Sequence, residues 1–166
     1  MKIFTVSLFG HRQINDWRLL DYLLFPKIKE LIQNKTYVSF LVGRNGDFDE
    51  YATSVIKRLQ KETDYENSEI NLVLPYKLSG IEYYEKYYDG IIIPDIACRW
   101  HPKSAITLRN KWMVERSDLI LFFVEHNVGG AYQTLKYAER LGKDIVNLGA
   151  VNSNEAKSDE KTWFSR

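Results

Sequence analysis

The sequence predicts a three-layer α/β fold with a mainly parallel sheet of five strands. Three observations support this fold class. Short apolar segments alternate with segments of helical periodicity along most of the chain. Glycine-containing loops follow three of the apolar segments, where strands end and helices begin. The 166 residues are 45% hydrophobic and 14% aromatic, which suits one globular domain with a buried core.

Each apolar segment is interpreted as a strand and each periodic segment as a helix. The first expected helix begins after an N-cap at residues 15–16, and Pro26 inside it predicts a kink or a restart. A later helix ends near Arg116, and the glycine pair Gly129-Gly130 opens another. The five expected strands are residues 3–9, 37–42, 70–74, 119–124 and 144–148.

Residues 76–102 form the least regular part of the sequence, in which a short helix and, before Pro94, a short extended piece are expected, with a flap as one role for them. Four tyrosines there have helical spacing, which favours a core or dimer stripe over a surface that stacks on a nucleobase. They are Tyr83, Tyr84, Tyr87 and Tyr88. Residues 1–150 are expected to form a single domain, and residues 151–166 a polar tail.

The charge balance and the cysteine content exclude several classes of protein. A formal net charge of +1 gives no overall field that would recruit nucleic acid or a membrane. No apolar run approaches the length of a membrane span, and the amino terminus lacks the features of a signal peptide. The single cysteine, Cys98, excludes an intrachain disulfide. The three histidines have no metal-ligand spacing, so we expect no metal site. Without a signal peptide or a membrane span, a cytoplasmic protein is the default, and no cofactor is expected.

Three loops are expected to meet at the carboxyl edge of the sheet. Right-handed crossovers would place the first and fourth strands side by side, which is where ligands bind in open α/β sheets. The glycine pair opens a helix there, and the unpaired N–H groups and the helix dipole favour a phosphate. The expected ligand-binding residues come from these loops and the adjoining helices: Gly10, His11, Arg12, Gly43, Arg44, Asn45, Gly46, Asp49, Arg109, Asn110, Asn127, Gly129, Gly130, Ala131 and Thr134.

Simpler structural roles stay open for several of these residues. The glycine pair could serve only a tight turn, and Thr134 could pack rather than donate its hydroxyl. Arg12 suits a bidentate phosphate contact, although a solvated loop position accounts for it equally well. Asp49 either holds a ribose hydroxyl or caps its helix. Arg109, interpreted as the start of a helix, either reaches the pocket or forms a surface ion pair.

The motifs GHR, LVGRNGDFDEYA, LVLPY, RNKWMV with SDLILFFV, and GGAYQTLKYA follow one another from Lys2 to Leu148. This order resembles the small SLOG-family proteins of bacteria and their phages. Their superfamily includes the cytokinin-activating phosphoribohydrolases, or lysine decarboxylase-like proteins, and the DNA-processing proteins. The resemblance implies a Rossmann-like fold, a nucleotide-derived ligand and a homodimer or higher homo-oligomer. It also implies a pocket lined by Gly43, Gly46, Asp49, Arg109, Asn110, Gly129 and Gly130.

The catalytic glutamate of the phosphoribohydrolases has no match in this chain. Their PGGxGTxxE motif aligns that glutamate with Lys136, and the GTxxE pattern of nucleoside deoxyribosyltransferases aligns it with Thr134. Cleavage of an N-glycosidic bond needs a group that stabilises an oxocarbenium-like state or activates the nucleophile. Glu125 and Asp49 are the alternative carboxylates. The departure favours binding over catalysis.

The leading hypothesis is a SLOG-type protein that binds a nucleotide, ADP-ribose, an NAD-type molecule or a cyclic nucleotide, as a sensor or a sponge. Such a role would suit signalling in phage or bacterial defence. A nucleotide or nucleoside N-glycosidase that uses Glu125 or Asp49 is the second hypothesis, and a module that binds single-stranded DNA is the third. The near-neutral charge argues against nucleic acid and no membrane is expected, so the expected partners are a nucleotide-derived small molecule and further copies of this chain.

Overall fold

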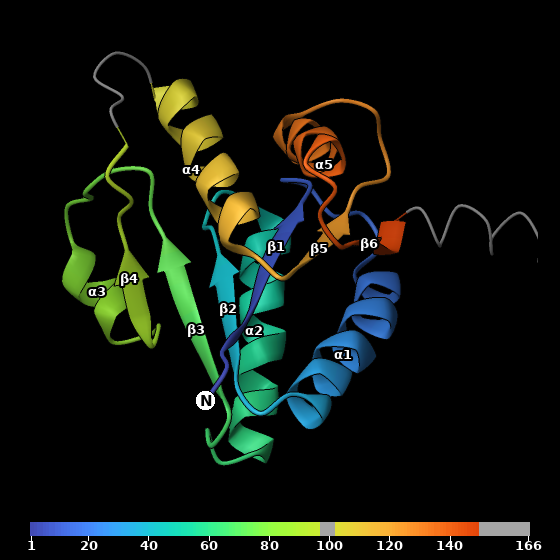
Figure 1. Ribbon diagram of the computed structural model, residues 1–166, viewed down its shortest axis with the longest axis vertical. Helices are drawn as coiled ribbons and strands as arrows, with labels where there is room; N and C mark the ends of the chain where they lie inside the picture. Colours follow the sequence, from blue (N-terminus) through green and yellow to red (C-terminus); the bar gives the residue numbers. More distant parts are fainter. Residues whose placement is uncertain (97–101, 150–166) are drawn as a thin grey trace, which may run out of the picture.

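In the computed structural model, which describes residues 1–96 and 102–149, helices cover both faces of one parallel sheet (Figure 1). The strands are β1 (Phe4–Gly10), β2 (Val38–Val42), β3 (Ser68–Val73), β4 (Gly90–Ile92), β5 (Leu119–Phe123) and β6 (Ile145–Asn147). The helices are α1 (Trp17–Asn34), α2 (Asp47–Glu62), α3 (Ile81–Glu85), α4 (Pro102–Arg116) and α5 (Gly130–Arg140). Cys98 and the expected tail at 151–166 lie outside the described residues.

The strand order β4-β3-β2-β1-β5-β6 confirms the α/β class, with every neighbouring pair parallel. The expectation of five strands is wrong, because the sheet has six. The additional strand, β4, lies at the edge and pairs with β3 from Asn71↔Gly90 to Val73↔Ile92. It is the short extended piece expected before Pro94. Its residues are only half-buried, and the pairing with β3 is what defines this piece as a strand of the sheet.

The side chains of each strand point alternately to the two faces of the sheet, and the buried core therefore consists of two clusters, one between the sheet and each layer of helices. Val6, Leu8 and Phe40 belong to a cluster that includes the apolar faces of α1 and α2. Phe9 and Phe122 point to the other face and belong to a cluster with residues of α4 and α5. Successive side chains of a strand point to opposite faces, so each strand stabilises both layers.

Helix α1 differs from the expectation at Pro26. Asp16 is its N-cap, since the carboxylate accepts a hydrogen bond from the Leu19 amide at 3.0 Å. The helix then continues through Pro26 without the expected restart. Leu24 and Ile28, on either side of the proline, are fully buried. Their packing against the sheet offsets the loss of one backbone hydrogen bond at Pro26.

Two further expectations change in the region before β5. Helix α4 begins at Pro102 and not at Arg109, which lies in the middle of the helix. The tyrosine segment does not form a core stripe, because Tyr83 is 74% exposed and Tyr87 is 45% exposed. Tyr88 does pack partly against the core. Among the described residues, no helix combines the length and the apolar character that crossing a membrane requires.

The expected neighbourhood of the first and fourth predicted strands is confirmed. Strand β1 pairs with β5 from Val6↔Leu119 to Gly10↔Phe123. The chain moves outward from β1 to β4 on one side, then crosses to β5 on the other (Figure 1). The loops that follow β1 and β5 therefore diverge at this point and leave room for a ligand between them.

Candidate functional site

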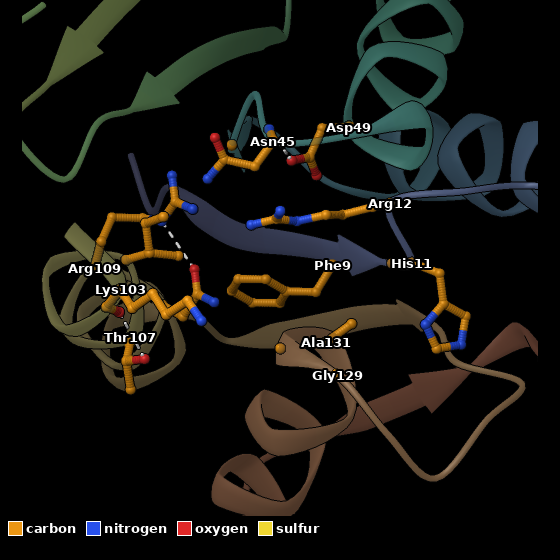
Figure 2. Close-up of a pocket in the computed structure, with 15 residues that line it drawn as sticks. Phe9, His11, Arg12, Asn45, Asp49, Lys103, Thr107, Arg109, Gly129 and Ala131 are labelled. Carbon is orange, nitrogen blue, oxygen red and sulfur yellow. Dashed lines mark hydrogen bonds between the residues drawn. The ribbon is translucent and has the colours of Figure 1, made fainter.

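A cavity of about 500 Å³ opens at the carboxyl ends of β1 and β5. Four parts of the chain surround it: the end of β1, the β2–α2 turn, one face of α4 and the start of α5 (Figure 2). Its volume is in the range of small-molecule sites in proteins. The lining residues are Phe9, Gly10, His11, Arg12, Gly43, Asn45, Asp49, Lys103, Ile106, Thr107, Arg109, Asn110, Gly129, Gly130 and Ala131.

The structure brings most of the expected site residues to this cavity and places four outside its lining. Arg44 turns to the opposite side of its loop, where its guanidinium lies 3.3 Å from the Tyr84 hydroxyl. Gly46 supports the loop after β1 instead, as its α-carbon faces the backbone of Arg12. Thr134 lies one turn inside α5, and Asn127 lies in the exposed loop before that helix.

The start of α5 leaves backbone donors uncovered at the cavity. Gly129 has a φ of 96°, a left-handed conformation that a residue with a β-carbon rarely adopts. No side chain caps the helix, and Gly129 and Gly130 are both exposed. A β-carbon at Gly130 would meet nothing within 4 Å, so the space in front of these amides is open. The first N–H groups of α5 and the helix dipole together attract an anion.

Arg109 is a buried cation rather than a member of a surface ion pair. Its side chain is held by Val73, whose carbonyl accepts from Nη1 at 2.7 Å, and by Asn110, whose Oδ1 accepts from Nε at 2.8 Å. Burial lowers the pKa of the guanidinium, whereas the charge of Asp49 opposes that effect. These two hydrogen bonds use Nε and Nη1, and a guanidinium has five N–H groups, so further donors remain for a ligand in the cavity.

Asp49 faces Arg109 across Gly43. A β-carbon built on Gly43 would lie 3.0 Å from Asp49 Oδ2 and 3.1 Å from Arg109 Nη1, so a side chain there would press on both groups. Asp49 also accepts a hydrogen bond from the Asn45 amide at 2.9 Å. Although part of the residue is exposed, burial of its carboxyl group raises the pKa to about 6, against the opposing influence of the Asn45 amide and of Arg109.

The end of β1 contributes two different side chains. Arg12 extends across the cavity toward Arg109 and Asn45 (Figure 2). His11 turns to the loop after β5, where its Nε2 accepts from the amides of Glu125 at 2.9 Å and His126 at 3.3 Å. An accepting Nε2 means that the ring is neutral, with its proton on Nδ1. Burial and the neighbouring His126 lower the pKa of His11, while Glu125 raises it.

Four lining residues were not predicted from the sequence. Phe9 is the last side chain of β1 on the α4 face and lies in the middle of the cavity (Figure 2). Lys103, Ile106 and Thr107 lie on α4 before Asn110. Residues 103, 106, 107 and 110 have the spacing of one helical face. A helix start at Pro102 would have identified this face, since proline is common at the first helical position.

The two candidate catalytic carboxylates have different positions. Asp49 lines the cavity, whereas Glu125 is exposed and lies outside the lining. Lys136, which aligns with the phosphoribohydrolase glutamate, forms an exposed ion pair with Glu139 at 3.3 Å. Thr134, at the other aligned position, donates to the Gly130 carbonyl at 2.8 Å. Asp49 is therefore the one carboxylate among the described residues that line the cavity.

No protein-family model matches the sequence, and no curated protein matches it either. The fold is similar to that of DNA processing protein A from Streptococcus pneumoniae, with a TM-score of 0.62 and 13% identity, over 86% of this chain and 49% of that chain. It is also similar to DNA processing protein A from Helicobacter pylori, described with a single-stranded DNA binding mode. That match has a TM-score of 0.59 and 14% identity, over 86% of this chain and 63% of that chain.

A third similar structure is the molybdenum cofactor binding protein of the phototrophic bacterium Rippkaea orientalis. Its TM-score is 0.59 and its identity 14%, over 95% of this chain and 86% of that chain. These three similarities confirm the fold that the resemblance to SLOG-type proteins implies. This chain spans less than two thirds of either DNA processing protein. The expectation that nucleic acid is an unlikely partner is not supported, since one of these similar proteins is described with a single-stranded DNA binding mode.

Proposed function

We propose that this chain binds a nucleotide-derived ligand whose phosphate lies at the N-terminus of α5. One observation carries the proposal: the uncapped start of α5 and the cations Arg12, Lys103 and Arg109 surround a single cavity. Asp49 is the single carboxylate in the described lining, so the balance of charge there is positive. Backbone amides and guanidinium groups are both strong partners of a phosphate.

The opposite wall suits the sugar of such a ligand. Asp49 is mostly ionised at neutral pH, because its pKa is about 6, and its free lone pairs suit a ribose hydroxyl. The side-chain Nδ2 of Asn45 is buried without a hydrogen-bond partner in the described part of the chain. A buried donor without a partner is unfavourable, and a ligand oxygen at that position would satisfy it. Phe9 adds an apolar surface between the two walls.

The proposed ligand class includes mononucleotides, ADP-ribose, NAD-type molecules and cyclic nucleotides. The proposed role is that of a sensor of such a ligand, or of a sponge that sequesters it, in bacterial or phage signalling. Single-stranded DNA belongs to the same chemistry, since it also carries phosphates and sugars. Its binding is proposed for this chain only through the shared fold. Dimerisation, expected from the resemblance, is measured by sedimentation at several concentrations of the protein.

Ultrafiltration of the full chain with a nucleotide panel tests the proposal. The panel holds adenine and guanine nucleotides, NAD, ADP-ribose and cyclic forms, and both the filtrate and the ligand released on denaturation are chromatographed. We expect one ligand to be depleted from the filtrate and recovered intact. Gly130→Val should abolish this binding and keep the fold, because the added side chain enters open space in front of the α5 amides. Gly130→Ala is the matched smaller change. Unaltered affinity in Gly130→Val would reject the phosphate position.

An N-glycosidase is the second candidate function, and the position of Asp49 favours it. A carboxyl group with a pKa of about 6 can exchange a proton near neutral pH, as a general acid or base must. This activity predicts that free base accumulates with turnover in the same chromatograms. It also predicts that Asp49→Asn stops the release while Glu125→Gln, outside the lining, does not. Recovery of intact ligand only would assign the cavity to binding.

A further inference from the structure

A second hollow of about 370 Å³ lies beside the main cavity and is called the tyrosine groove here. It is lined by Arg44, Glu50, Thr53, Tyr83, Tyr84, Tyr87 and Tyr88. None of these residues lines the main cavity. The groove is formed by the start of α2 on one side and by the short helix α3 with the residues after it on the other.

The aromatic rings of the groove are arranged edge to face, and cations lie over two of them: Arg44 over Tyr84 and Lys57 over Tyr87. Tyr83 and Tyr84 are perpendicular with centroids 5.5 Å apart, and Tyr87 and Tyr88 are perpendicular at 5.2 Å. Helix α3 buries none of its own residues. Tyr83 is 74% exposed, so its ring is accessible from solvent. An accessible tyrosine ring is a surface on which a nucleobase can stack.

The polar groups of the groove suit a base rather than a phosphate. Arg44 donates to the Tyr84 hydroxyl, and its guanidinium lies over that ring, 5.6 Å from the ring centre. A flat guanidinium is itself a surface on which a base can stack. The carboxylate of Glu50 repels a phosphate but accepts from the amino group of a base. Thr53 is 1% exposed, and although it lies beside Tyr88, its hydroxyl has no hydrogen bond of acceptable geometry among the described residues.

The groove and the main cavity are opposite sides of one turn. Gly43, Asn45 and Asp49 line the cavity, whereas Arg44 and Glu50 line the groove. One segment, residues 43–50, therefore forms a wall of both spaces. The charge of Arg44 also lowers the pKa of Arg109 inside the cavity. A sugar-phosphate link that crosses the turn would join the two spaces.

We propose that the tyrosine groove binds the nucleobase of a second nucleotide, linked through its sugar and phosphate to the nucleotide in the main cavity. The inference rests on the proposed function, because the first nucleotide of the pair is the one proposed to bind in the main cavity. The stacking surface is argued from the residues of the groove and does not depend on that proposal. The shared chemistry is a pair of linked nucleotides, and its source is either a dinucleotide or a short single strand.

Affinity measurements with matched probes test the linkage. Adenosine 5′-monophosphate, the 5′-phosphorylated diadenylate and the same diadenylate with its second base removed are titrated into the full chain and into Tyr83→Ala. We expect Tyr83→Ala to leave the monophosphate affinity unchanged and to weaken the diadenylate by about 5- to 150-fold, the range of stacking on one ring. The probe without its second base should bind both proteins equally. Tyr83→Trp should restore the affinity, and Tyr22→Ala, which removes a ring that is 73% exposed outside the groove, should change nothing.

Adenosine alone distinguishes failure of the groove from failure of the phosphate site, since it has a base and no phosphate. In a chain with labelled tyrosine rings, millimolar adenosine should shift the ring signals of the groove in both the native protein and Arg12→Ala. If adenosine shifts the tyrosine ring signals but no phosphorylated probe binds, the proposed function is rejected, and the groove still stands as a site for a nucleobase. Absence of shifts, or an equal loss of the mono- and dinucleotide in Tyr83→Ala, would reject the groove. A 12-residue single strand of deoxyadenylate that binds more tightly per site than diadenylate would identify a nucleic acid as the source.

Discussion

The side-chain amide of Asn110 donates a hydrogen bond at 3.2 Å to the hydroxyl of Thr134, and this contact joins α4 to α5 behind the cavity. It belongs to a longer chain of contacts, in which Arg109 donates to Asn110 and Thr134 donates to the Gly130 carbonyl. The buried cation and the open end of α5 are thereby held at a fixed separation. Preorganised donors bind an anion more tightly than mobile ones.

Thr134→Val should loosen this arrangement. Valine has almost the shape of threonine, but it leaves the Asn110 amide without an acceptor in a partly buried position. We expect the free energy of unfolding to fall by about 1–3 kcal/mol, the cost of an unpaired buried polar group. Urea denaturation measures the change. Thr107→Val, at an exposed position of α4 on the rim of the cavity, removes a hydrogen bond to the Lys103 carbonyl and should change the free energy of unfolding by less than about 0.5 kcal/mol. Equal effects of the two substitutions would contradict the role of Thr134.

The carboxyl group of Asp49 should make stability fall as the pH rises from about 4 to about 6. Its pKa is raised from 3.8 to about 6 in the folded chain, so the folded state binds the proton more tightly than the unfolded state in this range. The contribution is full below 3.8 and lost above about 6, and it amounts to at most about 3 kcal/mol. Urea denaturation of the native chain and of Asp49→Asn across pH 3.5–7.5 isolates it, since the other carboxylates are common to both. A constant difference between the two proteins would show that Asp49 titrates normally.

Much of the fold and of the cavity could be predicted from the sequence because both follow from local patterns. Apolar runs locate β1, β2, β3 and β5, and a glycine pair locates the start of α5. The carboxyl ends of parallel strands meet at one edge, so the residues after β1, β2 and β5 had to converge. Glycine loops at that edge were sufficient to predict residues 10–12, 43, 45 and 129–131 as lining.

The remaining features depend on contacts that no local pattern records. Arg44 follows Gly43 in the same loop but turns to Tyr84, which comes from a segment far along the chain. Strand β4 has three residues and is defined by its pairing with β3. Lys103 and Thr107 were missed because a helix start was expected at Arg109, and their tertiary position follows only once α4 begins at Pro102.

Gly46→Ala should alter the cavity from outside its lining. A β-carbon there would lie 2.5 Å from the α-carbon of Arg12, so the loop after β1 has to move away. That loop is also held by the Asp47 amide, which donates to the Arg12 carbonyl at 2.9 Å. We expect a loss of stability of about 1–3 kcal/mol, as for overpacking, together with a displaced Arg12 and weaker ligand binding. Gly130→Ala, which meets no atom within 4 Å, is the control for stability. A native melting temperature in Gly46→Ala would contradict the close packing of the two loops.

Acidification should release the loop between β5 and α5 through His11. The neutral ring accepts from the amides of Glu125 and His126, and burial lowers its pKa below 6.5 in the folded chain. The unfolded state therefore binds a proton first as the pH falls, so the stabilisation by His11 is full above 6.5 and is lost as the pH falls through its lowered pKa. We expect His11→Ala to lower the free energy of unfolding by about 1 kcal/mol at pH 8. This difference from the native chain should shrink toward pH 5. The hydrogen-exchange protection of the Glu125 amide should decline over the same range. Because this loop leads directly into the start of α5, ligand affinity should decline with it. Protection that stays constant from pH 8 to pH 5 would mean that His11 does not hold the loop.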